Sequence, residues 1–369
     1  MSFVTHIITG LNVGGAERAL FNLLTNGLEG PFENRVISLT DMGHYGPLLR
    51  EQGIQVTCIN MQPGRPTPVA LWRLHKSVKE HPFGILQGWM IHGNIAASLE
   101  SKMCTGQHAL IWNIRRTLEG IESMRASTRA LTKLGARISR SADAVIYNAQ
   151  KAIPQYVGIG YSDTNAHYLP NGFDTAVWHP DPEEKTRLRA ELGIAPGTRI
   201  IGFVGRRHPD KDPDNLLDAF GMLQHLADKA CLVMVGRDLE RPGFDPARVK
   251  FLGQRTDIQT LMQGFDVLCL SSQVEGFPNV IGEAMATAVP CVTTDVGDAR
   301  SIVSDTGWVA PPRDPQQLAL CLQEALSTSP AALKERGEHA RARIVTHFSI
   351  EAVVERYVSL YRSVTKDVH

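Results

Sequence analysis

Residues 267–286 read VLCLSSQVEGFPNVIGEAMA, and the order of residue types in this stretch decides the fold class. The run Val267–Leu270 is continuously apolar, which is typical of a parallel strand that is buried on both faces. Pro278 suits the first turn of a helix, because the first turn does not need its missing N–H. The stretch therefore predicts a strand, a short loop and a helix, which is the repeating unit of an open α/β sheet.

The same unit recurs along the whole chain. Short runs rich in Val, Ile and Leu alternate with segments of helical spacing, such as residues 213–226 and 316–326. The runs are Phe3–Thr9, Arg35–Leu39, Val56–Ile59, Ile85–Gly88, Ala109–Ile114 and Ala144–Tyr147, and then Arg199–Val204, Cys231–Val235, Val249–Leu252, Val267–Leu270 and Pro290–Thr293. We therefore expect two doubly wound α/β sheets, one in each half of the chain.

The expected domain boundary follows from the chain length and from a turn-forming Pro-Asn-Gly segment. A chain of 369 residues favours two domains. Pro170-Asn171-Gly172 interrupts the pattern, so we predict one domain over residues 1–170 and a second over residues 171–349. The last segment, residues 350–369, is predicted to form a helix with one apolar face.

Composition excludes several classes of protein. Lys plus Arg and Asp plus Glu both number 38, so the chain is neither a globally basic nucleic-acid binder nor a protein with a strongly acidic tail. The six cysteines form no CxxC pair, which favours buried thiols in a reducing compartment over a zinc site. No apolar run approaches the length of a membrane span, and Arg18 is the first basic residue. We therefore expect a cytoplasmic protein without a signal peptide.

Two loops that follow strands are candidates for binding phosphate. The loop Gly10-Leu-Asn-Val-Gly14-Gly15 precedes a helix whose free N–H groups would favour an anion, although it lacks the GxGxxG spacing and the lysine of a P-loop. In the second half, Arg206 and Lys211 follow the strand at residues 199–204 and could hold a diphosphate. A tight structural turn and a solvated basic turn are the respective alternatives.

Two glutamates flank the predicted start of the helix after Pro278. The N–H groups of Asn279 and Val280 would point toward the strand ends and favour an anion there. Glu275 and Glu283 could then accept hydrogen bonds from hydroxyl groups, which suits a nucleotide or a sugar phosphate. The alternative is that Glu275 only complements the helix dipole and Glu283 lies at the surface.

Five motifs in this order resemble the retaining GT-B glycosyltransferases of family 4. They are Gly14-Gly15-Ala-Glu-Arg, Pro170-Asn-Gly-Phe-Asp174, Val204-Gly-Arg206 with Lys211, Phe251-Leu-Gly-Gln-Arg-Thr-Asp257, and Glu275-Gly-Phe-Pro-Asn-Val with Glu283-Ala-Met. The resemblance covers nearly the whole chain. It implies two facing Rossmann-like domains with a cleft between them, the first binding the acceptor and the second the donor. It also implies a C-terminal helix that crosses back to the N-terminal domain.

The resemblance assigns roles to individual residues. The implied catalytic set is Arg206, Lys211, Glu275 and His92, and the implied ligands of the donor diphosphate are Gly15, Arg206, Lys211, Asn279 and Val280. Glu283 is implied to bind the ribose, Arg255 to flank the base, and Glu275 and Phe277 to contact the sugar. Pro278 departs from the glycine of many relatives and removes one N–H from the phosphate site.

The implied reaction moves a sugar from a nucleoside-diphosphate sugar, with UDP the commonest carrier in the family, to a hydroxyl of a glycan or lipid-linked acceptor. Surface polysaccharide or lipopolysaccharide assembly is the implied setting. Asp210-Lys-Asp212 matches the Asp-x-Asp pattern of a metal-binding motif, but its lysine would compete with a metal cation. No metal and no cofactor are therefore expected. A nucleotide-sugar 2-epimerase, another GT-B enzyme and a catalytically idle sugar-nucleotide-binding partner are the alternatives.

Basic residues mark the acceptor half. Arg115 and Arg116 directly follow a strand and are candidates for lining the acceptor site. A stripe at helical spacing, formed by Arg125, Arg129, Lys133 and Arg137, could contact anionic lipid headgroups at the inner face of a membrane. The alternative for the stripe is a solvated helix face.

Overall fold

The computed structural model describes residues 3–28, 30, 32–62, 66–81, 84–104, 108–121, 126–226 and 229–365. The chain divides into two compact units. The first unit comprises Met1–Gly172 together with Ile350–His369, and the second comprises Phe173–Ser349. Each unit has its own parallel sheet and its own cores.

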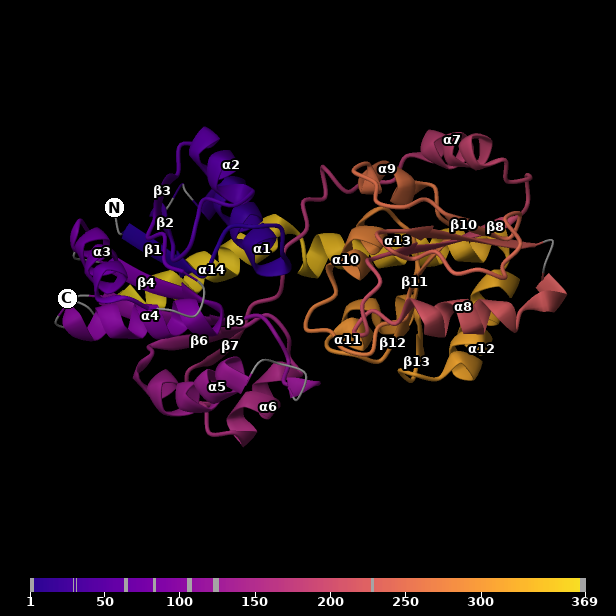
Figure 1. The fold of residues 1–369 in the computed structure, drawn as a ribbon. Helices are drawn as coiled ribbons and strands as arrows, with labels where there is room; N and C mark the ends of the chain where they lie inside the picture. Colours follow the sequence, from indigo (N-terminus) through magenta and orange to yellow (C-terminus); the bar gives the residue numbers. More distant parts are fainter. Residues whose placement is uncertain are drawn as a thin grey trace. The chain divides into compact units, whose positions relative to one another are not determined.

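The first unit is built around a seven-stranded parallel sheet with the order β3-β2-β1-β4-β5-β6-β7 (Figure 1). The strands are β1 (Phe3–Ile8), β2 (Glu33–Ser38), β3 (Gln55–Cys58), β4 (Gly84–Trp89), β5 (His108–Ile114), β6 (Ala144–Tyr147) and β7 (Ala166–Tyr168). The helices are α1 (Gly15–Leu23), α2 (Tyr45–Glu51), α3 (Pro68–Lys79), α4 (Met90–Met103), α5 (Ala126–Ile138), α6 (Ala152–Gly158) and α14 (Ile350–Thr365), with the short helices η1 (Leu24–Leu28) and η3 (Ser139–Ser141).

This sheet separates two hydrophobic cores, because successive strand residues point to opposite faces. Ile8 packs on the face covered by α1, α2 and α14, whereas its neighbour Ile7 packs on the face covered by α3, α4, α5 and α6. Both faces are buried, which explains why the strands are continuously apolar in the sequence.

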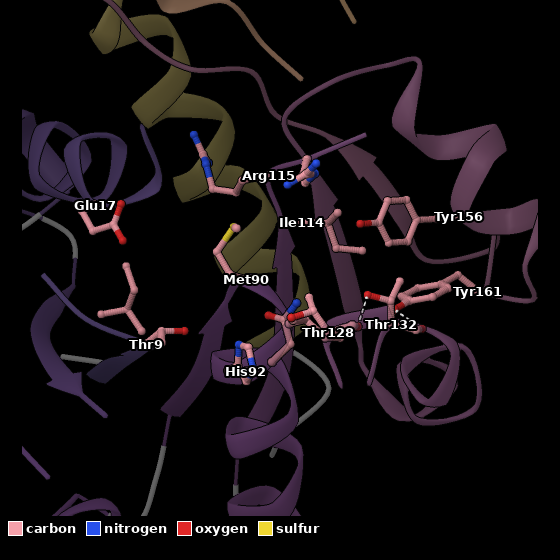
Figure 2. Close-up of a pocket in the computed structure, with 14 residues that line it drawn as sticks. Thr9, Glu17, Met90, His92, Ile114, Arg115, Thr128, Thr132, Tyr156 and Tyr161 are labelled. Atoms are coloured by element: carbon pink, nitrogen blue, oxygen red, sulfur yellow. Dashed lines mark hydrogen bonds between the residues drawn. The ribbon is translucent and has the colours of Figure 1, made fainter. Parts of the chain in front are cut away.

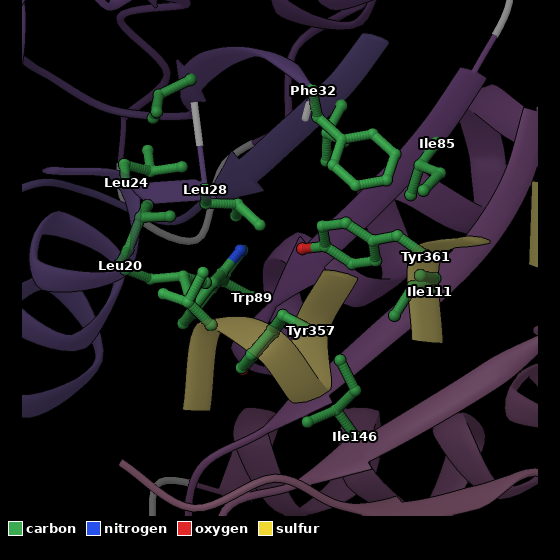
Figure 3. Packing of buried hydrophobic residues seen from close by; sticks show 14 of the residues in the cluster. Leu20, Leu24, Leu28, Phe32, Ile85, Trp89, Ile111, Ile146, Tyr357 and Tyr361 are labelled. Atoms are coloured by element: carbon green, nitrogen blue, oxygen red, sulfur yellow. The ribbon is translucent and has the colours of Figure 1, made fainter. Parts of the chain in front are cut away.

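Helix α14 packs into the first of these cores although it follows the second unit in the chain. Tyr357 and Tyr361 are buried among side chains of α1 and of strands β4 and β5 (Figure 3). Tyr361 meets Phe32 edge to face, with ring centroids 5.3 Å apart, and its hydroxyl donates a hydrogen bond to Gln87. Asn113 donates to the Tyr357 hydroxyl over 3.1 Å. The predicted return of the last helix to the first domain is thereby confirmed.

The second unit contains a six-stranded parallel sheet with the order β10-β9-β8-β11-β12-β13. The strands are β8 (Arg199–Val204), β9 (Ala230–Val235), β10 (Val249–Phe251), β11 (Val267–Leu270), β12 (Cys291–Thr294) and β13 (Trp308–Ala310). The helices are α7 (Pro182–Leu192), α8 (Pro213–Gly221), α9 (Ile258–Gln263), α10 (Asn279–Ala286), α11 (Ala299–Val303), α12 (Pro315–Ser327) and α13 (Pro330–His347), with the short helices η4 (Gln224–Leu226) and η5 (Ser304–Thr306). Helices α8 and α12 cover one face of the sheet, and α7, α9, α10 and α11 cover the other.

Most helix starts in the second unit combine a proline with a capping side chain. Asp181, Asp212, Asp314 and Ser329 each accept a hydrogen bond from the first turn of α7, α8, α12 and α13, respectively. Helix α10 differs, because Pro278 occupies the N-cap position itself and no side chain caps the helix. The helix therefore begins one residue later than the sequence predicted.

Within the residues described here, no helix combines the length and the apolarity that a membrane crossing requires.

Candidate functional site

The site in the second unit lies where the strand order reverses. Strand β8 has β9 on one side and β11 on the other, so the loops that follow β8 and β11 leave the sheet side by side at its carboxyl edge. Residues 205–212 form the first of these loops and residues 271–278 the second. The sheet order thus brings together two segments that lie more than fifty residues apart in the sequence.

The two loops are joined by backbone and side-chain hydrogen bonds. The backbone N–H of Gln273 donates to the carbonyl of Asp210 over 2.7 Å. The Ser271 hydroxyl donates to the carbonyl of Asp212 over 2.8 Å. These contacts fix the positions of the charged residues that the loops carry.

Lys211 and Glu275, both predicted catalytic residues, form an ion pair. Nζ of Lys211 lies 2.5 Å from Oε1 of Glu275, and the hydroxyl of Ser272 donates to the same oxygen over 2.8 Å. The Glu275 side chain is 11% exposed and that of Lys211 is 33% exposed. The pair is therefore partly desolvated, and Lys211 has no second carboxylate in contact among the described residues.

The carboxylates of the Asp210-Lys-Asp212 segment are used inside the protein. Oδ1 of Asp212 accepts from the backbone N–H of Asn215, and its Oδ2 accepts from the Gln273 side chain over 2.6 Å. Asp212 also adopts a left-handed conformation, with φ of 43°. Asp210 lies 3.5 Å from Nδ1 of His208. Asp212 therefore serves as a helix cap and a loop clamp.

Two consecutive arginines on the first loop have different environments. Arg207 donates to the carbonyls of Asp238 and Leu239 and pairs with Asp214 over 2.6 Å, so its guanidinium is committed to the fold. Arg206 is exposed, and within the described part of the chain its guanidinium makes no hydrogen bond or ion pair. Of the two, Arg206 is the cation that a ligand could bind.

Glycines keep the neighbouring sheet edge free of side chains. A Cβ atom on Gly236 would lie 1.9 Å from the carbonyl oxygen of Gly205, and the φ of Gly236 is +148°. The N–H of Gly236 donates to the carbonyl of Gly253 over 2.8 Å. The backbone at the ends of β8 and β9 is therefore packed too closely for a side chain at Gly236.

Helix α10 presents its N-terminus beside these loops. The first N–H groups of a helix have no acceptor within the helix, and its dipole favours an anion at this end. Asn279 and Val280, both predicted to bind the diphosphate, occupy the first two positions of α10. Glu283, predicted to bind the ribose, is 4% exposed on the same helix.

Phe277 was predicted to contact the sugar, but its side chain lies in the core of the second unit. Its ring is 6% exposed and stacks on Phe173, with centroids 6.1 Å apart and an interplanar angle of 26°. Phe348 lies 5.9 Å away on centroids. Apolar packing therefore holds the ring, and a ligand could meet only the backbone of Phe277.

Phe173 explains the Pro170–Asp174 motif. A Cβ atom on Gly282 would lie 2.0 Å from the Phe173 ring, so the absence of a side chain at Gly282 lets α10 sit directly on this phenylalanine. The next motif residue, Asp174, accepts hydrogen bonds from the N–H groups of Ala176 and Val177. The motif therefore positions α10 through packing.

Arg255, predicted to flank the base, lies on the loop between β10 and α9. Its guanidinium donates to both oxygens of Asp257, over 2.8 and 2.6 Å, and to Glu191 over 3.0 Å. These carboxylates raise the pKa of Arg255, and the hydrogen bonds from the Arg255 guanidinium lower the pKa of Asp257. The side chain is committed to these partners, and the loop backbone is the part that could meet a base.

A second candidate site is a cavity of about 370 Å³ in the first unit. It lies at the carboxyl edge of the sheet, where β1 is flanked by β2 and β4 and the strand order again reverses. Thr9, Glu17, His92, Arg115 and Tyr156 line it from five different segments (Figure 2). The structure thus places His92 and the predicted acceptor-side residues Arg115 and Arg116 in one cavity.

Close backbone packing sets the position of His92. A Cβ atom on Gly93 would lie 2.3 Å from the carbonyl oxygen of Ile7, so the first turn of α4 sits directly on β1. Met90, at the start of α4, is a non-glycine residue in the left-handed region, with φ of 61°. Burial lowers the pKa of His92, which favours the neutral imidazole at pH 7.

Arg115 is already held by the first unit. It donates to Asn171 and to Oδ1 of Asn113, and its guanidinium lies 5.1 Å from the centroid of the Trp89 ring. Burial lowers the pKa of Arg115. Burial also raises the pKa of Glu17, and the positive charge of Arg115 partly offsets this increase.

Gly15 and the predicted basic stripe both belong to the first unit. Gly15 is the first residue of α1 in the first unit. Arg129, Lys133 and Arg137 lie on α5, where Lys133 and Arg137 are exposed, and Arg125 lies outside the described residues.

The described residues also include a cluster that the sequence did not reveal. Ligand atoms of His75, Glu100 and Cys104 lie within 4.8 Å of one another. Nδ1 of His75 is 2.9 Å from Oε2 of Glu100, an ordinary hydrogen-bond distance. Glu100 lies eight residues after His92 on α4, about 12 Å along the helix, so the cluster is separate from the cavity.

Residues 198–328 match the family model described as glycosyl transferases group 1. This segment is similar to the glycosyl transferases of group 1. The matched segment contains the loops with Arg206, Lys211 and Glu275 and the whole of α10. The family resemblance predicted from the motifs is confirmed.

Curated relatives are similar to this chain over longer stretches than the family model. Over 252 residues the chain is 31% identical to D-inositol 3-phosphate glycosyltransferase of Corynebacterium urealyticum, covering 62% of this chain and 58% of that protein. Over 294 residues it is 24% identical to the lipopolysaccharide core biosynthesis mannosyltransferase LpsB of Rhizobium meliloti, covering 71% and 81%. The chain spans about half the length of the first curated relatives that it matches.

The fold also matches a solved structure. The crystal structure of Anabaena HepE in complex with UDP has a TM-score of 0.82 and 22% identity to this chain, covering 98% of this chain and 100% of HepE. A likeness at this level of identity shows the fold. The predicted GT-B class, with two Rossmann-like units, is confirmed.

Proposed function

We propose that the protein transfers a sugar from a nucleoside-diphosphate sugar, with UDP as the carrier, to a hydroxyl group, with retention of the anomeric configuration. The Lys211–Glu275 pair beside Arg206 and the start of α10 carries this proposal. This edge of the sheet combines cations and helix N–H groups with carboxylates, which suits a ligand that has both phosphates and hydroxyls. The group 1 match over these residues and the UDP in the HepE crystal structure support it.

In the proposed reaction, the bond between the anomeric carbon and the diphosphate breaks and negative charge develops on the leaving oxygen. Arg206 and Lys211, with the first N–H groups of α10, stabilise that charge where it forms. The acceptor oxygen bonds to the anomeric carbon on the same face, and its proton passes to the leaving phosphate. No bond to the protein forms, so the residues act by position and charge.

Glu275 has two duties in this scheme. It holds the Lys211 ammonium through Oε1, which places the cation before the donor binds. Its carboxylate also accepts hydrogen bonds from the sugar hydroxyls and so orients the anomeric carbon. Glu283, one turn into α10, accepts hydrogen bonds from the ribose.

The proposed reaction needs no metal ion or cofactor. Lys211 and Arg206 supply the positive charge that a divalent cation supplies in other phosphate sites. Both carboxylate oxygens of Asp212 accept hydrogen bonds within the protein, which leaves the Asp210–Asp212 segment poorly suited to a cation.

We further propose that the first-unit cavity binds the acceptor, a glycan or lipid-linked molecule of surface polysaccharide or lipopolysaccharide assembly. The name of LpsB supports this setting. Arg129, Lys133 and Arg137 on α5 would contact an anionic membrane surface from the cytoplasmic side.

A nucleotide panel tests the donor site. Thermal unfolding is measured with UDP, GDP, ADP, CMP and NAD for the wild type, Arg206→Ala, Lys211→Ala and the control Arg187→Ala, whose side chain is 67% exposed on α7. Binding at one hundred times Kd stabilises the native state by about 2.7 kcal/mol. We expect UDP alone to stabilise the wild type and the control, and both site variants to lose most of the effect. Stabilisation by NAD alone, or by no diphosphate, would contradict the proposal.

Turnover separates the proposed transfer from its alternatives. With a UDP-sugar and an acceptor, the transferase releases UDP and forms a glycoside with the anomeric configuration of the donor. A 2-epimerase would convert the UDP-sugar to its epimer without an acceptor. An idle binding partner would bind UDP and change none of the donors.

A further inference from the structure

Arg116 carries a positive charge into the first-unit cavity, and its Nε has no hydrogen-bond partner within the described part of the chain. The residue directly follows β5 and lines the cavity. Its Nε is shielded from solvent and has no hydrogen-bond partner within the described residues. A guanidinium stays protonated in proteins, so this N–H donor is buried at a cost in free energy. A ligand that accepts its hydrogen bond would remove that cost.

The neighbouring Arg115 shows what a structural arginine looks like at this place. Its guanidinium donates to Asn113 and Asn171 and lies over the Trp89 ring. No ion pair of the described residues joins a carboxylate to Arg116. The fold therefore uses Arg115 and leaves Arg116 for the cavity.

The charges of the cavity have a positive excess. Two cationic side chains, Arg115 and Arg116, and one carboxylate, that of Glu17, line the cavity. His92 adds no charge at neutral pH, because its burial favours the neutral ring. Glu17 interacts with Arg115, and no other carboxylate is among the described residues that line the cavity.

The positive excess is concentrated at one end of the cavity. Tyr156 is close enough to Arg116 for the guanidinium to lower the tyrosine pKa, which burial raises to about 12. Glu17 and Tyr156 lie on opposite sides of the residues that line the cavity (Figure 2). An anion beside Arg116 and the Tyr156 hydroxyl would thus be separated from the Glu17 carboxylate.

The volume limits the size of the ligand. About 370 Å³ is at the small end of ordinary ligand pockets, which hold roughly 300–1,000 Å³. Ile8, Ile91 and Ile114 supply apolar walls, while the Tyr161 hydroxyl is already used as a donor to the carbonyl of Thr132 over 2.9 Å. These dimensions suit one sugar-sized unit with a single charged group.

We infer that the acceptor of this protein carries an anionic group, a phosphate or a carboxylate, and that Arg116 binds that group in the first-unit cavity. The inference rests on the proposed function, because it assigns the cavity to the acceptor. Arg116 selects the acceptor by charge, and the remainder of the acceptor extends toward Glu17 and Thr9.

The test compares matched charged and neutral probes by calorimetry on the full chain without nucleotide. Glucose 6-phosphate and glucuronate each add one anionic group to glucose, which is the neutral probe. Glycerol 1-phosphate and phosphatidylglycerol vesicles distinguish a free phosphate from a lipid headgroup. We expect at least one anionic probe to bind ten or more times more tightly than its neutral counterpart.

Three variants identify the residue responsible. Arg116→Gln should abolish the preference for the anion, Arg116→Lys should keep part of it, and the control Arg73→Gln, on the exposed face of α3, should leave it unchanged. Removing the buried, unpartnered donor should not lower the melting temperature of the unliganded protein, whereas loss of a structural arginine would. Equal binding of charged and neutral probes by the wild type, binding of no probe, or an unchanged preference in Arg116→Gln would overturn the inference.

UDP binding is measured on the same samples. Retained UDP binding by Arg116→Gln shows that the variant is folded. If the wild type binds UDP but shows no anion preference, this inference fails and the proposed function stands. If the wild type prefers the anion but binds no UDP, the proposed donor site fails instead.

Discussion

Replacing Lys211 with alanine should weaken the binding of UDP by about 10- to 150-fold. The structure places the ammonium at the carboxyl edge of the second sheet, 2.5 Å from Glu275 and on the loop that carries Arg206. A hydrogen bond to a charged group contributes about 1.5–3 kcal/mol, and every 1.4 kcal/mol is about tenfold in affinity. The expected change in Kd follows from these two values.

The same substitution should also lower the stability of the second unit, for a separable reason. It leaves the Glu275 carboxylate, which is 11% exposed, without its cation. Exposed pairs contribute about 0.2–1 kcal/mol, and breaking a buried pair costs about 3–5 kcal/mol. Since Lys211 is 33% exposed, we expect an intermediate loss of about 1–2 kcal/mol.

Calorimetry with UDP and urea unfolding separate the two effects. The double variant Lys211→Ala/Glu275→Gln also removes the negative charge of Glu275, so it should recover most of the stability and remain at least about tenfold weaker for UDP. Lys334→Ala, an exposed lysine on α13, is the control and should change neither quantity. The reasoning is refuted if UDP affinity is unchanged in a folded Lys211→Ala protein, or if the double variant regains full affinity.

Three further predictions concern pH, backbone and metal. Burial lowers the pKa of His6 from 6.5 to about 4, so the unfolded state binds the proton more readily than the folded state. The contribution of neutral His6 to the free energy of unfolding is therefore complete above pH 6.5 and is lost as the pH falls toward 4. Between pH 7 and pH 5 the first unit should lose about 2 kcal/mol in urea titrations, and His6→Gln should flatten that slope. Gly236→Ala should destabilise the second unit by about 2–4 kcal/mol, because its Cβ would lie 1.9 Å from the Gly205 oxygen. A Gly236→Ala variant with the same free energy of unfolding as the wild type would contradict this prediction. EDTA should leave UDP affinity unchanged by calorimetry, and a requirement for Mg²⁺ would refute the metal-independent scheme.

Much of the fold was predictable because parallel strands buried on both faces leave a strong trace in the sequence. Every predicted apolar run overlaps a strand of the structure. Strands β7 and β13 were missed; each has three residues, and no apolar run marks β7. Proline after a capping side chain marked helix starts such as α8 and α12.

The contacts within the site were less predictable, because they depend on strand order. Lys211 and Glu275 are 64 residues apart, and only the placement of β11 beside β8 brings them together. The family resemblance named Arg206 and not Arg207, and the structure adds that the Arg207 guanidinium is held by Asp238 and Asp214. The sequence also did not reveal that the Phe277 ring is buried, since an apolar residue in a loop can face either a ligand or the core.

Hydrogen exchange of the full chain with and without UDP tests the central claim most directly, because it reports where the nucleotide binds. The account predicts slower exchange in residues 205–212 and in the first turn of α10, within the second unit. Peptides from α13, on which Lys334 lies, should be unchanged. Protection confined to the first unit, or no protection at saturating UDP, would contradict the account.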